Sequence, residues 1–366
     1  MELRLCVLVL LAFVLGSNAF DTSFPMANFT INLDDPPQER WNEVIDTYHD
    51  ELMKAIEVLP NIIPEKIRPM IIAKSEWIGE RLEESMGEYG LEMQGIAKRM
   101  GVSNGLIVLV NIIYEVTFVG CTSIVAQAED GSVLHGRNQD LGDGKGQTTL
   151  LRNIVLYATF KKNDQILYHG NTFAGYVGLP TGMRPNQWSI SLDATMEMDN
   201  KINEFDNIMY GLIGGVIEGK ASLVTILTRH TLQTVETYSD AVEVMGNHPI
   251  VAPVYYIIAG AQQGEGVVIT RNRTVAWDEW QLDGSNYGWF LVETNYNHWE
   301  RNPVSDPRRQ VAVSCMNSVG QENITLTTLY GCLSQEPVMN PLTTYTAVMN
   351  PSTNHYSSFV RRTVLE

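Results

Sequence analysis

Two short runs of β-forming residues, at 122–127 and 132–135, flank the dipeptide Asp130-Gly131 and constrain the fold more than any other stretch. Asp-Gly is a strong signal for a two-residue hairpin turn. If only these two residues form the turn, Cys121 at the start of the first strand pairs with Asp140 at the end of the second. The sequence therefore predicts a thiol beside a carboxylate at a strand end.

Cys121 has two interpretations from this pattern. A lone cysteine is most often a buried residue that packs as a small hydrophobic side chain. A thiol beside a carboxylate at a strand start can instead be a nucleophile. The hairpin alone leaves both interpretations open.

The residues of the hairpin resemble one family. Cys-Thr-Ser-Ile-Val at 121–125, followed by His-Gly-Arg-Asn-x-Asp at 135–140, is similar to the start of the catalytic chain in the acid ceramidase and N-acylethanolamine acid amidase group. That group belongs to the cholylglycine-hydrolase branch of the N-terminal nucleophile hydrolases. The resemblance implies an αββα sandwich, a nucleophilic Cys121, and a cut of the chain between Gly120 and Cys121.

The cut has a chemical logic that does not depend on the family. A thiol must lose its proton to attack, and a free α-amino group, with an ordinary pKa of about 8, can take that proton. In the uncut chain this nitrogen is an amide and cannot act as a base. Cys121 Sγ would therefore first attack the Gly120 carbonyl to form a thioester that water opens, and this processing would activate the enzyme.

The resemblance assigns roles to four further residues. Arg137 would fix Asp140 and the cysteine backbone, and Asp140 would hold the α-ammonium or thiol proton. Asn295 matches the family's oxyanion donor, whose loss typically costs ~3 kcal/mol of barrier. Arg308 matches an active-site arginine in Asp-Pro-Arg-Arg, where the family has Asp-Asp-Arg-Arg.

Arg137 and Asp140 cannot both reach the thiol from a regular strand. Strict alternation places their side chains on opposite faces. We therefore expect a bulge or a strand end near Asn138.

A glycine-punctuated stretch at 170–182 is the expected wall of the acyl site. Glycines let a backbone approach a ligand closely, although a plain connection with glycine turns has the same composition. A phosphate loop is excluded because the Gly-Lys-Ser/Thr ending is absent. The resemblance places Tyr176, Gly178 and Asp193 at the substrate. A glutamate that often follows Asp193 in the amidases is Ala194 here.

The chain divides into three parts at positions 19 and 120. Residues 1–19 predict a secretory signal peptide, because an apolar run too short to span a bilayer precedes small residues at a cleavage position. Apolar spacing predicts helices in 20–120, and the resemblance makes this part a helical alpha subunit. Residues 121–366 contain apolar strand runs and would be the catalytic beta subunit. The expected fold class is α+β.

One apolar set in the N-terminal part has two interpretations. It either packs as ordinary core, which is the commoner case, or meets a membrane or lipid-micelle surface. The set consists of Leu59, Ile62, Ile63, Ile67, Met70 and Ile71.

Composition narrows the partners and the compartment. A net charge of −17 argues against nucleic acid and suits an acidic compartment. Glycosylation sequons begin at Asn28, Asn272 and Asn323. Removal of the signal peptide leaves three cysteines. Cys315 and Cys332 could form a disulfide or stay unpaired, and Cys121 is the candidate free thiol.

These features predict a lysosomal or secreted cysteine amidase that hydrolyses fatty acid ethanolamides to fatty acid and ethanolamine. Hydrolysis of ceramide to sphingosine and fatty acid is the alternative within the class. A non-catalytic lipid-binding protein is the alternative outside it, and Ala194 is its main support. The expected partners are fatty acyl amide lipids and the protein's own cleaved subunits, as a heterodimer. No cofactor or metal is expected.

Overall fold

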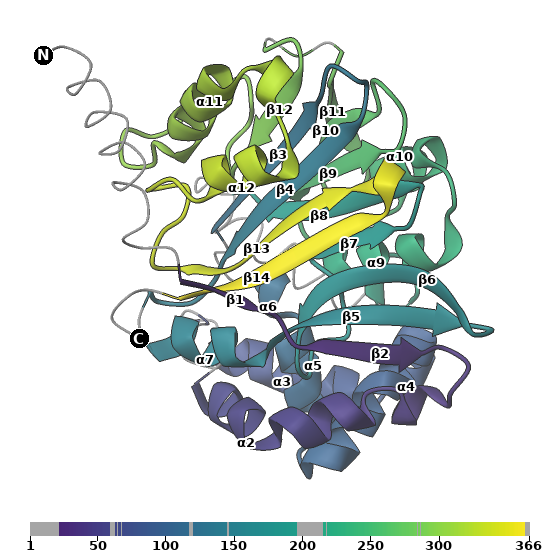
Figure 1. The fold of residues 1–366 in the computed structure, drawn as a ribbon. Helices are drawn as coiled ribbons and strands as arrows, with labels where there is room; N and C mark the ends of the chain where they lie inside the picture. The colour runs from purple at the N-terminus through teal and green to yellow at the C-terminus, as the bar shows by residue number, and fades with distance from the viewer. Residues whose placement is uncertain are drawn as a thin grey trace, which may run out of the picture.

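A computed structural model describes residues 22–58, 63, 65–66, 68–116, 120–144, 146–195, 215–216, 218–283, 285 and 287–362. The expected signal peptide at 1–19 lies outside these residues. Within them the chain forms two β-sheets with helices around them (Figure 1). No helix in the described part of the chain is both long and apolar enough to cross a lipid bilayer.

The first sheet has six antiparallel strands in the order β1-β14-β13-β4-β3-β12. Its strands are β1 (Thr22–Pro25), β3 (Gly120–Gln127), β4 (Val133–Asp140), β12 (Phe290–Glu293), β13 (Thr343–Asn350) and β14 (His355–Arg362).

The second sheet has eight strands in the order β11-β10-β9-β8-β7-β6-β5-β2, and only the β2–β5 pair is parallel. Its strands are β2 (Asn28–Asn32), β5 (Val155–Lys162), β6 (Gln165–Phe173), β7 (Thr181–Arg184), β8 (Trp188–Ala194), β9 (Val254–Gly260), β10 (Gly266–Arg271) and β11 (Ala276–Gln281).

The two sheets face each other across an apolar layer. Val125 and Val133 of the first sheet and Tyr255, Ile257 and Val268 of the second belong to one fully buried cluster. Burying each side chain of this size contributes roughly 1.5–3 kcal/mol. The near-continuous apolar runs of these strands follow from this arrangement, since helices cover the outer faces of both sheets.

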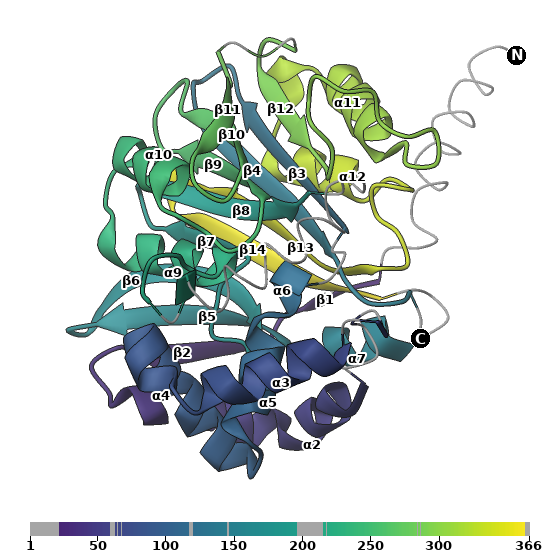
Figure 2. The same cartoon turned by 180° about the vertical axis from the view of Figure 1, so that it is seen from behind.

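The outer layers are pairs of helices. α11 (Arg308–Val319) and α12 (Leu326–Leu333) pack on the six-stranded sheet. α9 (Val224–Thr234) and α10 (Tyr238–Asn247) cover the eight-stranded sheet, as the view from behind shows (Figure 2). The order helix, sheet, sheet, helix confirms the predicted αββα sandwich.

The segment before Gly120 packs at one end of the sandwich (Figures 1 and 2). Its α-helices are α2 (Asn42–Val58), α3 (Arg68–Gly79), α4 (Leu82–Met100), α5 (Asn104–Asn111) and α6 (Ile113–Val116). α7 (Gly146–Ile154), which follows the expected cut, contacts α2. The segment is not only helical, because β1 and β2 add a strand to each sheet.

A buried ion pair joins the two parts of the chain. Arg229 of α9 donates to both carboxylate oxygens of Glu92 on α4, at 2.5 and 2.8 Å. Arg40 donates to the same carboxylate at 2.9 Å, and Trp41 donates its indole N–H to it at 2.7 Å. Removing one partner of such a buried pair would leave an uncompensated charge, so loss of either residue should destabilise the contact between the two parts of the chain.

The described residues include part of the apolar set at 59–71. Ile63 and Ile71 are fully buried, so they belong to the core, whereas Met70 is 39% exposed. Leu59, Ile62 and Ile67 lie outside the described residues.

The hairpin register differs by one residue from the prediction. Gln127 pairs with Val133, so Asp140 pairs with Gly120, and Cys121 pairs with Gln139. The predicted Cys121–Asp140 pairing is wrong because the loop contains three residues rather than two. It closes through a hydrogen bond from Ala128 N to Ser132 O, and Gly131 adopts a left-handed conformation with φ +84°.

The β3–β4 pairs continue without a bulge through Asp140, where β4 ends, and the irregularity expected near Asn138 lies in β13, as a register shift between Thr343 and Tyr345 opposite Asp140 and Gln139. Arg137 pairs with Ser123, two residues from Cys121, so Arg137 and Cys121 point to the same face of the sheet. Asp140 points to the opposite face, beside Gly120.

Candidate active site

Cys121 lies at the start of β3, fully buried between the two sheets. Its sulfur is 3.2 Å from a guanidinium nitrogen of Arg137, 3.6 Å from the Gln139 amide nitrogen and 3.8 Å from the Tyr114 hydroxyl. Burial raises the pKa of the thiol to about 12, although Arg137 lowers it. In the uncut chain the thiol is therefore protonated, and Arg137 is the cation placed to stabilise a thiolate.

Two backbone carbonyls hold Arg137, one from β8 of the second sheet and one from the loop that precedes β7. It donates to Leu192 O at 2.6 Å and to Pro180 O at 3.0 Å, and its charge lies 3.7 Å from Asp193. Because this arginine is fully buried, these partners fix its orientation toward the sulfur.

Asp140 lies on the other side of the expected scissile bond. It accepts from the Thr343 hydroxyl at 2.7 Å and the Asn340 amide at 2.9 Å, with Arg308 at 3.6 Å. Burial raises the pKa of this carboxyl, while these partners oppose the rise. A Cβ on Gly120 would lie 3.1 Å from Asp140 Cβ, so the carboxylate faces the Gly120 backbone rather than the thiol.

Asn295 and Arg308 hold the backbone of Cys121 from both ends. Cys121 N donates to Asn295 Oδ1 at 3.1 Å, and Arg308 donates to the same oxygen at 2.7 Å. Arg308 also donates to Cys121 O at 2.6 Å, and Asn295 Nδ2 donates to Ala194 O at 2.7 Å. The loop after β12 and the first residue of α11 thus meet at Cys121, from positions 174 and 187 residues further along the chain.

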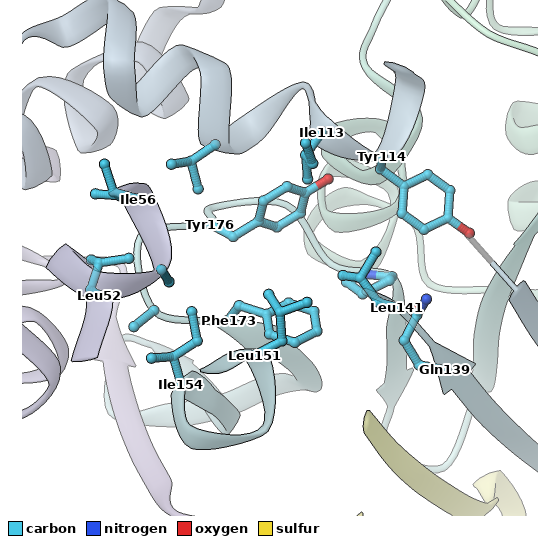
Figure 3. A pocket seen from close by; sticks show the side chains of 14 residues that line it. Leu52, Ile56, Ile113, Tyr114, Gln139, Leu141, Leu151, Ile154, Phe173 and Tyr176 are labelled. Carbon is cyan, nitrogen blue, oxygen red and sulfur yellow. The ribbon is translucent and has the colours of Figure 1, made fainter. Parts of the chain in front are cut away.

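An apolar cavity lies next to the contacts of Cys121 (Figure 3). Tyr114 and Gln139, which both contact the sulfur, lie together at one end, and Leu52 and Ile56 of α2 lie at the other. The lining comes from both sides of the expected cut: Leu52, Ala55, Ile56, Val110, Ile113, Tyr114, Gln139, Leu141, Leu151, Ile154, Phe173, Ala174, Tyr176 and Pro180.

The three expected substrate residues differ in position. Tyr176 lines the cavity and bonds its hydroxyl to Thr225 Oγ1 at 2.7 Å. Gly178 must be glycine, because a Cβ there would lie 2.2 Å from Thr225 Oγ1. Asp193 does not line this cavity and is fully buried between the sheets, where it accepts from Ser123 Oγ at 2.8 Å. Burial raises the pKa of Asp193 to about 8, against the opposing effect of Arg137.

Sequence reasoning missed Tyr114 and Gln139 as neighbours of the sulfur. Gln139 is the variable position in the His-Gly-Arg-Asn-x-Asp motif, and the correct hairpin register would have placed it opposite Cys121. Tyr114 comes from α6 and meets the sulfur only through packing, so no local signal marks it.

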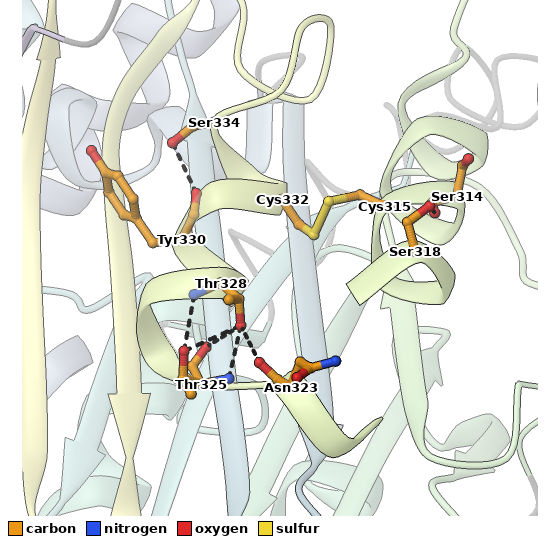
Figure 4. The surroundings of a disulfide bond; sticks show 9 residues. All are labelled: Ser314, Cys315, Ser318, Asn323, Thr325, Thr328, Tyr330, Cys332 and Ser334. Atoms are coloured by element: carbon orange, nitrogen blue, oxygen red, sulfur yellow. Dashed lines mark hydrogen bonds between the residues drawn. A yellow bond between two sulfur atoms is a disulfide. The ribbon is translucent and has the colours of Figure 1, made fainter. Parts of the chain in front are cut away.

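The remaining predicted sites lie away from the thiol. Cys315 and Cys332 form a disulfide between α11 and α12 (Figure 4), which leaves Cys121 as the free cysteine of the described chain. Asn28, Asn272 and Asn323 are exposed. No group of three or more His, Cys, Asp or Glu side chains within the described ranges could hold a metal ion.

Comparisons with known proteins place this geometry in a family. The family model for linear amide C–N hydrolases, choloylglycine hydrolase family, matches residues 121–312, and the one for the beta subunit of N-acylethanolamine-hydrolyzing acid amidase matches residues 24–84. The second description gives the name beta to the segment expected here as the alpha subunit.

Relatives match nearly the whole chain. It is 37% identical to the N-acylethanolamine-hydrolyzing acid amidase of Rattus norvegicus, over 91% of this chain and 88% of that protein. It is 34% identical to the acid ceramidase of Heterocephalus glaber, over 92% and 86%. The solved structure of the Caenorhabditis elegans ortholog of the acid amidase aligns with a TM-score of 0.57 at 34% identity, covering 66% of this chain and 100% of that one. The chain therefore belongs to the choloylglycine hydrolase family of linear amide C–N hydrolases.

Proposed function

We propose that this chain is a cysteine amidase that cuts itself between Gly120 and Cys121 and then hydrolyses fatty acid ethanolamides. The observation that carries the proposal is the apolar cavity whose lining includes Tyr114 and Gln139, the two side chains that also contact the Cys121 sulfur. An acyl chain in this cavity would bring its amide carbonyl to the thiol. The acid amidase relatives are named for the same reaction, which supports the choice of amine.

Self-cleavage would begin with attack of Cys121 Sγ on the Gly120 carbonyl carbon. The peptide nitrogen leaves as the α-amine of Cys121, and water opens the thioester to give the Gly120 carboxylate. Asn295 Oδ1, which accepts from Cys121 N in the uncut chain, would then hold the new amine, and Arg308 would keep the Cys121 carbonyl in place.

In the mature enzyme the same atoms would run the amide reaction. The α-amine takes the thiol proton, Sγ attacks the substrate carbonyl, and the amine returns the proton to the leaving ethanolamine. Water then attacks the thioester and releases the fatty acid. Arg137 would stabilise the thiolate, and Asn295 would stabilise the oxyanion. Asp140, which lies on the Gly120 side of the cut, would stabilise the α-ammonium group.

The two parts would stay together as a heterodimer through the Arg229–Glu92 pair. We further propose that the chain enters the secretory pathway through residues 1–19 and works in an acidic compartment such as the lysosome. Exposed sequons and a disulfide support the route. Substrate presented on a membrane or micelle surface is part of this proposal.

Ceramide is the second candidate substrate, because acid ceramidases match the chain as broadly as the amidases do. The deciding experiment first incubates the purified chain at mildly acidic pH and reads the new amino terminus, with Cys121→Ala as the uncut control. The mature enzyme is then given an N-acylethanolamine and a ceramide with the same acyl chain in the same neutral micelles.

Faster fatty acid release from the ethanolamide supports the first substrate, and the reverse supports ceramide. Mature enzyme whose free thiol has been alkylated is the control, and it should release nothing. If the chain is never cut before Cys121 and releases no fatty acid, the amidase proposal fails and a lipid-binding protein replaces it.

A further inference from the structure

Glu115 is a buried carboxyl close to the expected cut. It lies on α6, six positions before Cys121, and is 6% exposed. Its Oε1 accepts from the backbone N–H of Val224, the first residue of α9, at 2.9 Å. Its Oε2 is buried, and among the described residues none donates to it. The side chain thus joins the helix before the cut to a helix of the catalytic part.

Tyr114, the residue before Glu115 in the same helix, contacts Cys121. Tyr114 donates to Leu192 O at 2.7 Å, the carbonyl that also accepts from Arg137. Its hydroxyl lies 3.8 Å from the Cys121 sulfur. Glu115 and Tyr114 thus connect α6 both to α9 and to the thiol site.

We propose that Glu115 is a positioning residue for self-cleavage, seating α6 against α9 when its carboxyl is neutral and thereby making the cut depend on acid. This proposal rests on the proposed cut before Cys121. It assigns no contact between Glu115 and the reacting atoms, because Glu115 acts through the position of Tyr114 and the chain that follows it.

The direction of the effect follows from the surroundings of the carboxyl. Burial raises the pKa of Glu115 to about 7, although the Val224 N–H lowers it. The ionisable groups facing it are the hydroxyls of Tyr176 and Tyr256, and within the described residues no basic side chain forms an ion pair with it. When α6 packs on α9, the buried Glu115 carboxyl binds its proton more tightly than it does when α6 is detached and the carboxyl is hydrated. Low pH therefore favours the packed helix.

The first test compares the pH dependence of self-cleavage in the wild type and in Glu115→Gln, read by intact mass over time. Glutamine keeps the acceptor for Val224 and cannot ionise. We expect wild-type cleavage to slow by about ten- to a hundredfold between about pH 5 and about pH 8, and the variant to slow far less. Glu84→Gln, which removes an exposed charge from the same segment, should keep the wild-type profile.

The second test works even if the chain is never cut. In Cys121→Ala, hydrogen exchange at the Val224 amide reports the bond to Glu115, after correction for the intrinsic rate at each pH. Protection should fall as the pH rises through about 7, and should stay constant when Glu115→Gln is added.

Protection that does not change with pH overturns the role of Glu115. Absence of cleavage in the wild type at every pH overturns the proposed function instead. Parallel cleavage profiles in the wild type and Glu115→Gln also overturn the Glu115 proposal.

Discussion

Arg137 donates a hydrogen bond to the sulfur of Cys121 over 3.2 Å, from the strand that pairs directly with the strand of Cys121. The same guanidinium is fixed by two carbonyls, Leu192 O and Pro180 O. A planar group with several donors can hold the sulfur and both carbonyls at once. A single ammonium cannot.

Arg137→Lys should therefore lower kcat/KM of the mature enzyme by about ten- to a hundredfold, since a hydrogen bond to a charged group contributes roughly 1.5–3 kcal/mol. The pH–rate profile should also move to higher pH, because the thiolate loses stabilisation. Arg184→Lys is the matched control, since Arg184 contacts Glu236 rather than the thiol. An equal loss in both variants would mean that the effect is structural.

Asn295→Ala should reduce kcat by about a hundredfold with little change in KM, because a hydrogen-bond donor to the oxyanion lowers the activation barrier by ~3 kcal/mol. Self-cleavage should slow as well, since Asn295 Oδ1 accepts from the Cys121 amide. Steady-state kinetics on mature protein and cleavage rates on the precursor measure the two effects. Asn297→Ala removes a nearby buried amide that bonds Tyr255, so it should lower stability while kcat stays within a few fold of the wild type. A normal kcat in Asn295→Ala would exclude the oxyanion role.

Stability should decline as the pH rises, and Asp193 should be a principal cause. Burial raises the pKa of Asp193 from 3.8 to about 8 in the folded chain. The folded state therefore binds this proton more tightly than the unfolded state, and the stability present at low pH is lost as the pH climbs toward that value. Glu293, whose pKa burial raises to about 7, acts in the same direction.

The check is the Tm of the uncut Cys121→Ala chain across this pH range, with and without Asp193→Asn. Asparagine can still accept from Ser123 Oγ and cannot ionise, so the double variant should show a flatter decline. If the two curves keep the same slope, Asp193 is ionised in the folded protein and its proposed environment is wrong.

The resemblance predicted the layers of the fold, and four of the residues that it assigned to the site lie close together in the structure. These residues are Cys121, Arg137, Asn295 and Arg308. Their proximity was predictable because residues far apart in the chain matched one family pattern together. The hairpin register was not predictable from Asp130-Gly131 alone, since the same dipeptide also closes a three-residue loop with glycine left-handed.

Long-range packing accounts for the other differences. Tyr114 and Glu115 belong to a four-residue helix whose partners, Leu192 and Val224, lie 78 and 109 residues away. The strands β1 and β2 gain stability only by pairing with β14 and β5, so local propensity in a helix-rich segment gives little sign of them.

The disulfide between Cys315 and Cys332 should contribute stability without affecting the chemistry. It closes a loop with a sequence separation of 17, for which the chain-entropy estimate is about 3 kcal/mol. Cys315→Ala with Cys332→Ala should lower the free energy of unfolding by roughly this amount while kcat/KM of the folded enzyme is unchanged. Denaturant unfolding with and without a reductant measures the difference. A large fall in kcat/KM with intact folding would show that α11, which begins at Arg308, depends on the bond to hold the site.

The α2 end of the cavity should set the acyl chain that the enzyme accepts. Leu52 and Ile56 of α2 lie at the end away from Tyr114 and Gln139 (Figure 3), and Ala55, between them in the helix, also lines the cavity. Ala55→Phe would fill this end with a ring, so a long acyl chain could no longer place its carbonyl at Cys121 while a short one still could. The ratio of kcat/KM for long and short N-acylethanolamines should fall at least about tenfold, because each methylene that can no longer be buried forfeits about 0.8 kcal/mol.

Lys54→Phe puts the same ring on the exposed face of α2 and should leave the ratio unchanged. An unchanged ratio in Ala55→Phe would mean that the acyl chain occupies another path to the thiol, whereas an equal loss for both chain lengths would point to a disturbed α2 rather than a shortened cavity.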